Sequence, residues 1–385
     1  MLTIDRDQQL DQLLGTSIAE FDIPDDVYEL AVARYKHLGN WFSGYWAKSH
    51  SDGEVYPQGS FRLGTVVRPI NPRDHYDIDL VCRRDIAKES TSQQALKQDV
   101  GLGISLYVVT SPQGTPIRSE GKRCWTLDYP FESFHMDVLP ALPDGDGAKN
   151  AILLTDRELR EWQRSNPIDF ASWFYRMMRE EWVQLHEGLL KRMDVADVPE
   201  WKIKTTLQRT VQALKRHRDR FFADAQQDRP ASIILTTLAA MGYRGGGTLY
   251  EVLVDVTAKM PSMVERRNGV SWVANPVQPE ENFADRWRAY PHREARFFEW
   301  VEQASSDFSG YGAERGVDRV LEKVARTLGE DPAKHAGKVL GSGLSSARDA
   351  GVLGMGTGTG LLGPLVRRPV PRHTFHGDAP PTRRS

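Results

Sequence analysis

The stretch YDIDLVC at residues 76–82 constrains the fold more than any other part of the sequence. In a β-strand, side chains two residues apart point to the same face, so Asp77 and Asp79 project together while Ile78 and Leu80 face the other side. The apolar neighbours indicate a buried strand, and two buried carboxylates repel each other unless a cation lies between them. The stretch therefore predicts a strand of an α/β protein that carries a metal site. The alternative is an exposed edge strand with alternating charge.

Two further features favour the metal site. Gly59-Ser60 lies some 17 residues upstream of Asp77, and a Gly-Ser turn leading into a short helix offers N–H groups and a hydroxyl to a phosphate. A plain helix N-cap is the alternative for Ser60. Asp137, in the strand-like run FHMDVLPAL, supplies a third carboxylate to the same sheet, with Asp128 as a competitor in less apolar surroundings. Three carboxylates beside a phosphate-binding turn predict in-line nucleotidyl transfer with two metal ions.

The chemistry-bearing residues follow the pattern of one known superfamily. In their order and spacing, Gly59, Ser60, Asp77, Asp79 and Asp137 resemble the DNA polymerase β-like nucleotidyltransferases. Within that superfamily, QGSFRLGT and YDIDLVC, together with the later segments LQRTVQALKRHRDRFF, PASIILTTLAA and NPVQPEENFADRW, resemble the bacterial CD-NTases. These are the cyclic GMP-AMP synthase/DncV-like enzymes of CBASS anti-phage systems. The resemblance implies an α+β fold with a mixed sheet, an N-terminal helical spine and a C-terminal helical lobe that closes the nucleotide cleft.

The resemblance also implies roles for particular residues. Asp77, Asp79 and Asp137 match the metal-binding and catalytic triad, and Asp137 is the member that also draws the proton of the acceptor hydroxyl. The Gly-Ser turn matches the triphosphate-binding turn. Lys215 and Ser232 resemble helical-lobe positions that reach the donor triphosphate. A solvated surface charge is the alternative for Lys215, and a simple first-turn residue is the alternative for Ser232.

The implied activity is synthesis of a cyclic di- or trinucleotide second messenger from nucleoside triphosphates, with release of pyrophosphate. Two Mg²⁺ ions, replaceable by Mn²⁺, and ATP as a substrate are expected from the resemblance. Transfer to an RNA 3′-end or another acceptor is an alternative, but 50 Lys and Arg against 52 Asp and Glu give no broad basic surface for nucleic acid. An inert nucleotide- or peptide-binding module is a second alternative, which three mutually repulsive carboxylates argue against.

The residue pattern changes along the chain, and these changes predict four regions. Helical periodicity is followed by short β-like runs, then by further helical patterns, then by a Gly- and Pro-rich end. Further helices are expected over 248–267, 281–290 and 291–308. The predicted parts are a spine at 1–50, a catalytic core at 51–147, a helical lobe at 148–330 and a flexible tail at 331–385.

The remaining features concern partners and compartment. Cys82 and Cys124 are the two cysteines, which excludes a disulfide framework and a zinc insertion like that of the animal DNA sensor, so activation by DNA is not expected. The sequence starts without a signal-peptide core and has no apolar run that spans a bilayer, which predicts a cytoplasmic protein without a membrane partner. In the tail, the segment at 372–377 (RHTFHG) is a candidate docking peptide for an E1/E2-like conjugating protein or a HORMA-type regulator. An undistinguished polar terminus is the alternative.

Overall fold

The structure is a computed structural model, and it describes residues 6–71, 74–110, 116–121, 123–155, 161–193, 202–355, 362–364 and 368–369. The contacts within the chain divide it into two compact units. One unit comprises residues 18–310, and the other comprises residues 1–17 with 311–385. Each unit is described by itself.

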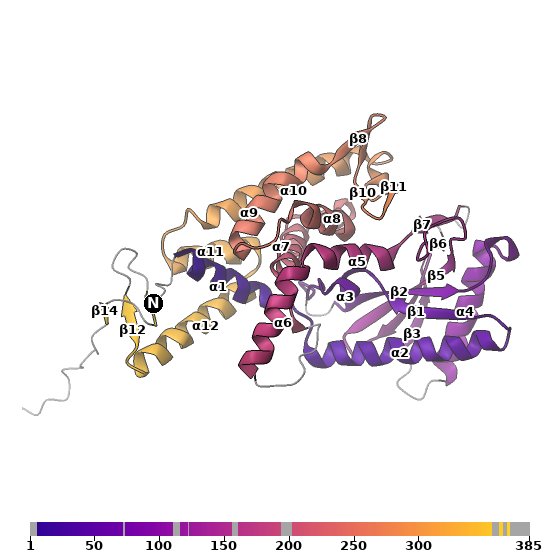
Figure 1. Cartoon of the computed structure of the whole chain (residues 1–385), viewed down its shortest axis with the longest axis horizontal. Coiled ribbons are helices and arrows are strands. Elements are labelled where there is room, and N and C mark those ends of the chain that lie inside the picture. The colour runs from indigo at the N-terminus through magenta and orange to yellow at the C-terminus, as the bar shows by residue number, and fades with distance from the viewer. Residues whose placement is uncertain are drawn as a thin grey trace, which may run out of the picture. The chain divides into compact units, whose positions relative to one another are not determined.

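The larger unit is built on a seven-stranded mixed sheet (Figure 1). Its central strands β2 (Tyr76–Arg84) and β5 (Phe134–Pro143) run parallel, and the other pairings are antiparallel. The remaining strands are β1 (Gly53–Pro57), β3 (Ile117–Glu120), β4 (Trp125–Tyr129), β6 (Ile152–Leu154) and β7 (Gln163–Ser165). The order β1-β2-β5-β4-β3 puts the two acidic runs on adjacent strands. The mixed sheet confirms the predicted fold class, although β6 and β7 extend it beyond residue 147.

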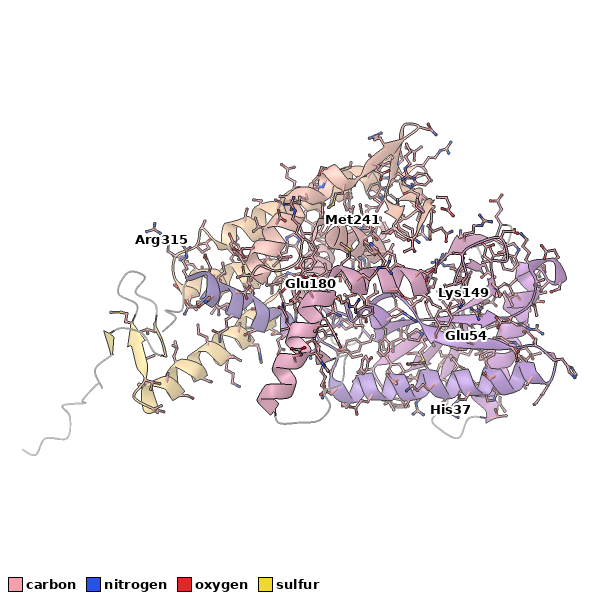
Figure 2. The ribbon with its side chains drawn as sticks, in the orientation of Figure 1. His37, Glu54, Lys149, Glu180, Met241 and Arg315 are labelled. Atoms are coloured by element: carbon pink, nitrogen blue, oxygen red, sulfur yellow. The ribbon has the colours of Figure 1, made fainter. Side chains whose placement is uncertain are left out.

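Two helices pack on one face of this sheet. Helix α2 (Asp25–Ala47) runs along the sheet and, with α4 (Gln93–Thr110), covers side chains such as Ile78 and Leu80, which are fully buried (Figure 1). His37 on α2, labelled in Figure 2, brings its Nδ1 to 3.1 Å from the Tyr107 hydroxyl of α4. Because the apolar positions of β2 face these helices, its alternate positions, Asp77 and Asp79, lie on the opposite face.

Helices make up most of the rest of this unit. They are α5 (Pro167–Met177), α6 (Arg179–Met193), α7 (Thr206–Phe221), α8 (Ser232–Gly242), α9 (Leu249–Lys259) and α10 (Pro291–Tyr311). Helix α7 begins at a capping box in which the Thr205 and Gln208 side chains each bond the other's backbone N–H. Helix α8 is buried nearly all round, as its apolar sequence predicts.

Two of the expected helices were wrong. Where a helix was predicted over 248–267, α9 ends at Lys259, and a hairpin of β8 (Glu265–Arg267) and β9 (Val270–Trp272) follows. Its two turn residues, Asn268 and Gly269, have φ of 51° and 78°, and this Asn-Gly pair is the preferred two-residue hairpin turn. The helix expected over 281–290 is absent: the end of β11 (Gln278–Asn282), which pairs with β10 (Ala274–Asn275), occupies its start, and a short 3-10 turn at Asp285–Trp287 follows. The helix expected over 291–308 is present as α10.

The smaller unit corrects the expected spine and tail. Most of α1 (Arg6–Ala19) belongs to this unit, together with α11 (Val317–Thr327) and α12 (Glu330–Asp349). Short strands follow at β12 (Leu353–Met355), β13 (Leu362–Pro364) and β14 (Arg368–Pro369). The prediction of a flexible tail from 331 is wrong over α12, because apolar positions such as Ala333 and Ala336 are buried. The candidate docking segment at 372–377 lies outside the described residues. None of the helices in the described ranges combines the length and apolarity needed to cross a membrane.

Candidate active site

The structure brings the three predicted carboxylates together on the face of the sheet opposite α2 and α4. Asp79 on β2 and Asp137 on β5 are directly opposite each other in the parallel register, and Asp77 lies two positions before Asp79. One carboxylate oxygen of each residue lies within 4.8 Å of those of the other two. Asp128, the competitor for the third place, is bonded instead to His75, with its Oδ1 2.8 Å from Nδ1.

The electrostatics of this cluster fit a bound divalent cation. Burial, followed by the negative charges of Asp77 and Asp137, raises the pKa of Asp79 to about 7, while Arg123 and Lys215 act in the opposite direction. The Asp79 carboxylate is therefore unfavourable as an anion, because the positive charges of the protein do not compensate for its burial and for its two acidic neighbours. Hard carboxylate oxygens at this spacing are ligands suited to Mg²⁺ or Mn²⁺. The residues present therefore fit the metal that the fold implies.

The predicted Gly-Ser turn lies against the middle carboxylate. The short helix α3 (Gly59–Leu63) begins with Gly59 at φ +59°, and a Cβ atom at this position would lie 2.8 Å from Asp79 Oδ2. The N–H of Gln58 donates to the main-chain carbonyl of Asp79 at 2.9 Å. Gln58, not Ser60, is the N-cap of α3. Within the part of the chain that the structure describes, the half-buried Ser60 hydroxyl makes no hydrogen bond, so it is available to a ligand.

The main chain that follows this turn is held by side chains from the helical half of the unit. Six of them donate hydrogen bonds of 2.5 to 3.0 Å to main-chain carbonyls within residues 62–68. The donors are Tyr175, Lys204, Gln208, Gln212, Lys215 and Arg216. Four of these donors lie on α7. They share one face of the helix, because Gln212 is four residues after Gln208, and Lys215 and Arg216 are three and four residues after Gln212. Because the acceptors are main-chain atoms, these bonds fix the path of the 62–68 segment regardless of its side chains.

Lys215 and Ser232 occupy different surroundings. Lys215 is not a solvated surface charge: it is 5% exposed, and its Nζ donates to the Thr65 carbonyl at 3.0 Å. Burial and the nearby Arg218 lower the pKa of Lys215 to about 7, against the opposing effects of Asp219, Asp79 and Asp77. Ser232, in the first turn of α8, accepts a hydrogen bond from Arg218 Nη1 at 2.8 Å. Contact of either residue with a triphosphate stays a prediction.

Three residues near the carboxylates were missed in the sequence. Thr126 on β4 donates its hydroxyl proton to Asp137 Oδ1 at 2.5 Å, and His135 on β5 has its Nε2 3.3 Å from Asp77 Oδ1. The hydrogen bond to Asp77 raises the pKa of His135. The positive charge of Arg123 counteracts the raised pKa of Asp79. His135 could have been found from the sequence, because it lies two residues before Asp137 in the same predicted strand and therefore shares the face of Asp137.

Comparison with known proteins identifies the domain that contains these residues. Residues 33–177, which contain the Gly-Ser turn and all three carboxylates, match the Second Messenger Oligonucleotide or Dinucleotide Synthetase (SMODS) domain. The c-di-GMP synthase of Roseivirga ehrenbergii is 27% identical over 329 residues, covering 84% of this chain and 85% of that protein. The cyclic dinucleotide synthase CdnG of Bradyrhizobium diazoefficiens is 27% identical over 302 residues, or 72% of this chain and 70% of that protein.

Solved structures show the same fold. The structure of Bradyrhizobium diazoefficiens CdnG in complex with GTP superposes with a TM-score of 0.69 and 21% identity, covering 86% of this chain and 99% of that one. The E. coli MS115-1 CdnC:HORMA-deltaN complex gives a TM-score of 0.61 and 14% identity, covering 83% and 96% of the two chains.

The sheet, its acidic triad and the adjoining turn fit a nucleotidyltransferase, and the SMODS match and the two cyclic dinucleotide synthase relatives support an enzyme of this class. The chain resembles the bacterial CD-NTases in its SMODS match, in its two cyclic dinucleotide synthase relatives and in its fold, which confirms the resemblance seen in its sequence. It is therefore an enzyme of a group that builds cyclic oligonucleotides from nucleoside triphosphates.

Proposed function

We propose that this enzyme condenses two molecules of GTP into a cyclic dinucleotide, with c-di-GMP as the first candidate product. The names of the two relatives, a c-di-GMP synthase and a cyclic dinucleotide synthase, support a two-nucleotide ring, and the GTP bound to CdnG supports guanine. ATP, the substrate expected from the sequence resemblance, is the second candidate. A cyclic trinucleotide is the alternative product.

The observation that carries this proposal is the convergence of Asp77, Asp79 and Asp137 beside the Gly59-Ser60 turn. The three carboxylates would hold two Mg²⁺ ions, which supply Lewis-acid activation of the attacking hydroxyl and neutralise the charge on the leaving pyrophosphate. The Ser60 hydroxyl would donate a hydrogen bond to the triphosphate of the donor nucleotide. Lys215, buried beside the 62–68 segment, and Ser232 are proposed to contact the same triphosphate from the helical half.

The chemical step follows from these positions. The acceptor hydroxyl oxygen attacks the α-phosphorus of the donor and forms a new P–O bond. The bond from that phosphorus to the α,β-bridging oxygen breaks, and pyrophosphate leaves. Asp137, whose Oδ1 is held by Thr126, accepts the proton of the acceptor hydroxyl. A second transfer of the same kind, between the remaining hydroxyl and the remaining triphosphate, closes the ring and releases a second pyrophosphate.

One experiment tests the proposal against its alternatives. The protein is incubated with each labelled nucleoside triphosphate, singly and in pairs, with Mg²⁺. The reaction is then treated with phosphatase, and resistant products are identified by mass. A resistant product with the mass of c-di-GMP from GTP alone is the expected result. A product that needs ATP would overturn the choice of base, and a linear product or one on an added RNA would overturn ring closure. Asp79→Asn is the control that should give no product.

We also propose a regulatory protein as a partner of the C-terminal region and a role for the product as a second messenger in anti-phage defence within the cytoplasm. The sequence resemblance supports this role, and CdnC, which shares the fold, is described in a complex with HORMA. Because α12 extends to Asp349, a truncation that tests the tail should end at Ala350 and leave this helix whole. The shortened chain should keep its basal nucleotide chemistry and lose binding to the regulator. Loss of basal chemistry in a folded chain would contradict the proposed separation of catalysis and control.

A further inference from the structure

Polar side chains form two rows across three neighbouring strands at the candidate active site. In the inner row, Asp79 of β2, Asp137 of β5 and Thr126 of β4 are opposite one another in the strand register. In the outer row, two positions along each strand, Asp77, His135 and Asp128 are opposite one another in the same way. Because the two rows are two residues apart, their side chains share one face of the sheet.

Each row contains one side chain that bonds a carboxylate of the triad. In the inner row, the Thr126 hydroxyl donates to Asp137 Oδ1 at 2.5 Å. In the outer row, His135 Nε2 is 3.3 Å from Asp77 Oδ1. Asp128, on the other side of His135, is bonded to His75 at 2.8 Å. Each of the two carboxylates in the outer row therefore contacts a different imidazole: Asp77 contacts His135, and Asp128 contacts His75.

We propose that His135 and Thr126 are positioning residues that hold the Asp77 and Asp137 carboxylates in the orientation the metal ions require. This inference rests on the proposed function, because it assigns to the two residues a role at the proposed metal site. Neither residue needs to touch a nucleotide or a metal ion. Each acts by fixing a ligand, one through a ring N–H and the other through a hydroxyl.

The physical reason is the exposure and mutual repulsion of the ligands. Asp77 is 60% exposed, so packing alone does not fix its side-chain rotation, and the other carboxylates repel it. A hydrogen bond from His135 selects one rotation that faces its neighbours. Outer residues that orient metal ligands in this way typically contribute about 10- to 100-fold to metal affinity. Loss of either bond should therefore weaken metal binding while leaving the fold and the nucleotide-binding turn intact.

The test compares variants that remove the donor with variants that keep it. His135→Phe and Thr126→Val remove the donors with little change of shape, whereas His135→Gln keeps an Nε2–H group and Thr126→Ser keeps the hydroxyl. His292→Phe is a matched control, because His292 forms an imidazole–carboxylate contact of 3.0 Å with Asp228 away from the triad. Mn²⁺ binding is measured by electron paramagnetic resonance with a GTP analogue whose α,β-bridging oxygen is methylene. The Mg²⁺ dependence of pyrophosphate release is measured with GTP itself.

We expect His135→Phe and Thr126→Val each to weaken Mn²⁺ binding by about tenfold or more, and excess Mg²⁺ to restore pyrophosphate release. His135→Gln, Thr126→Ser and His292→Phe should stay within about threefold of the natural protein. The Thr126 pair carries the same test if His135→Phe does not fold. Unchanged Mn²⁺ binding in the donor-free variants would overturn positioning alone. Equal losses in the donor-free and donor-keeping variants would do the same. Equal Mn²⁺ binding by the natural protein and by Asp79→Asn would instead overturn the metal site of the proposed function.

Discussion

Replacing Gly59 by alanine tests the contact between the phosphate turn and the metal site. Gly59 has φ of +59°, and a Cβ atom there would lie 2.8 Å from Asp79 Oδ2, closer than the 3.0 Å below which Cβ contacts essentially never occur. Two effects are therefore combined in this substitution. The left-handed backbone becomes strained, and the Asp79 carboxylate has to move away. The second effect is the one that concerns catalysis.

The two effects can be separated because the chain offers a matched glycine. Gly269 has φ of +78° and nothing within 4 Å of an added Cβ atom, so Gly269→Ala carries the backbone strain alone. That strain is about 1–2 kcal/mol, partly offset by about 0.4–1 kcal/mol from the smaller entropy of the unfolded chain. In Gly59→Ala the carboxylate also has to shift by roughly 0.5 Å to reach ordinary contact distance. Since a misplacement of about 1 Å in an active site can cost about 100-fold, we expect kcat to fall about 10- to 100-fold.

The assay measures pyrophosphate release from GTP at saturating Mg²⁺ for both variants, with melting temperatures measured in parallel. Gly269→Ala should keep close to the natural kcat. Gly59→Ala should lose activity while its melting temperature stays within a few degrees of that of Gly269→Ala. Equal activity in the two variants would refute the argument that the turn presses on Asp79. A much lower melting temperature for Gly59→Ala alone would show that the contact serves the fold and not the site.

Three further variants test other parts of the structure. Asp77→Asn combined with Asp79→Asn should abolish product formation, and the melting temperature without metal should hold or rise because like charges are removed; product from the double variant would contradict the metal assignment. Ser60→Ala should weaken GTP binding by about 1.5–3 kcal/mol in calorimetry while the melting temperature stays unchanged, because Ser60 is not the cap of α3. Glu281→Gln tests pH dependence: burial raises the pKa of Glu281 to about 7, so the native state keeps a proton that the unfolded state loses above about pH 4.5. Glu281 should contribute a fall in stability of at most about 1.4 kcal/mol per pH unit between these values, in addition to the fall that Asp79 contributes, and Glu281→Gln, unlike Glu280→Gln at the exposed neighbour, should remove the Glu281 contribution in thermal melts from pH 5 to 8.

The acidic centre of the site could be predicted because a strand with one apolar face shows an alternation of polar and apolar residues in its sequence. In β2 the alternation of Asp77, Ile78, Asp79 and Leu80 assigns each side chain to a face, and the burial of the apolar pair agrees with that assignment. The same reasoning placed Asp137 on a second strand, and the register sets it opposite Asp79. A period of two residues, combined with burial, is enough to bring such side chains to one surface.

Hydrogen bonds to the main chain could not be predicted in this way. The 62–68 segment is bound through its carbonyls, which every residue carries, so nothing in its own sequence marks it as a partner of α7. The hairpin at β8 and β9 was missed for a different reason. A helical period was extended past Lys259, although the pair Asn268-Gly269 is itself a strong hairpin signal. In the smaller unit, α12 was missed because the high glycine content of the end of the chain outweighed its buried alanines.

The contacts join α7 to the metal site without any α7 side chain needing to reach a metal ion. Gln208 Nε2 holds the Leu63 carbonyl at the end of α3, and the first residue of α3, Gly59, lies against the Asp79 carboxylate. Because α3 has five residues, a shift of its last carbonyl moves its first residue as well. The position of Asp79 therefore depends on the helical half of the unit as well as on its own strand. The geometry of the triad thus has three separate supports: His135 for Asp77, the Gly59 turn for Asp79 and Thr126 for Asp137.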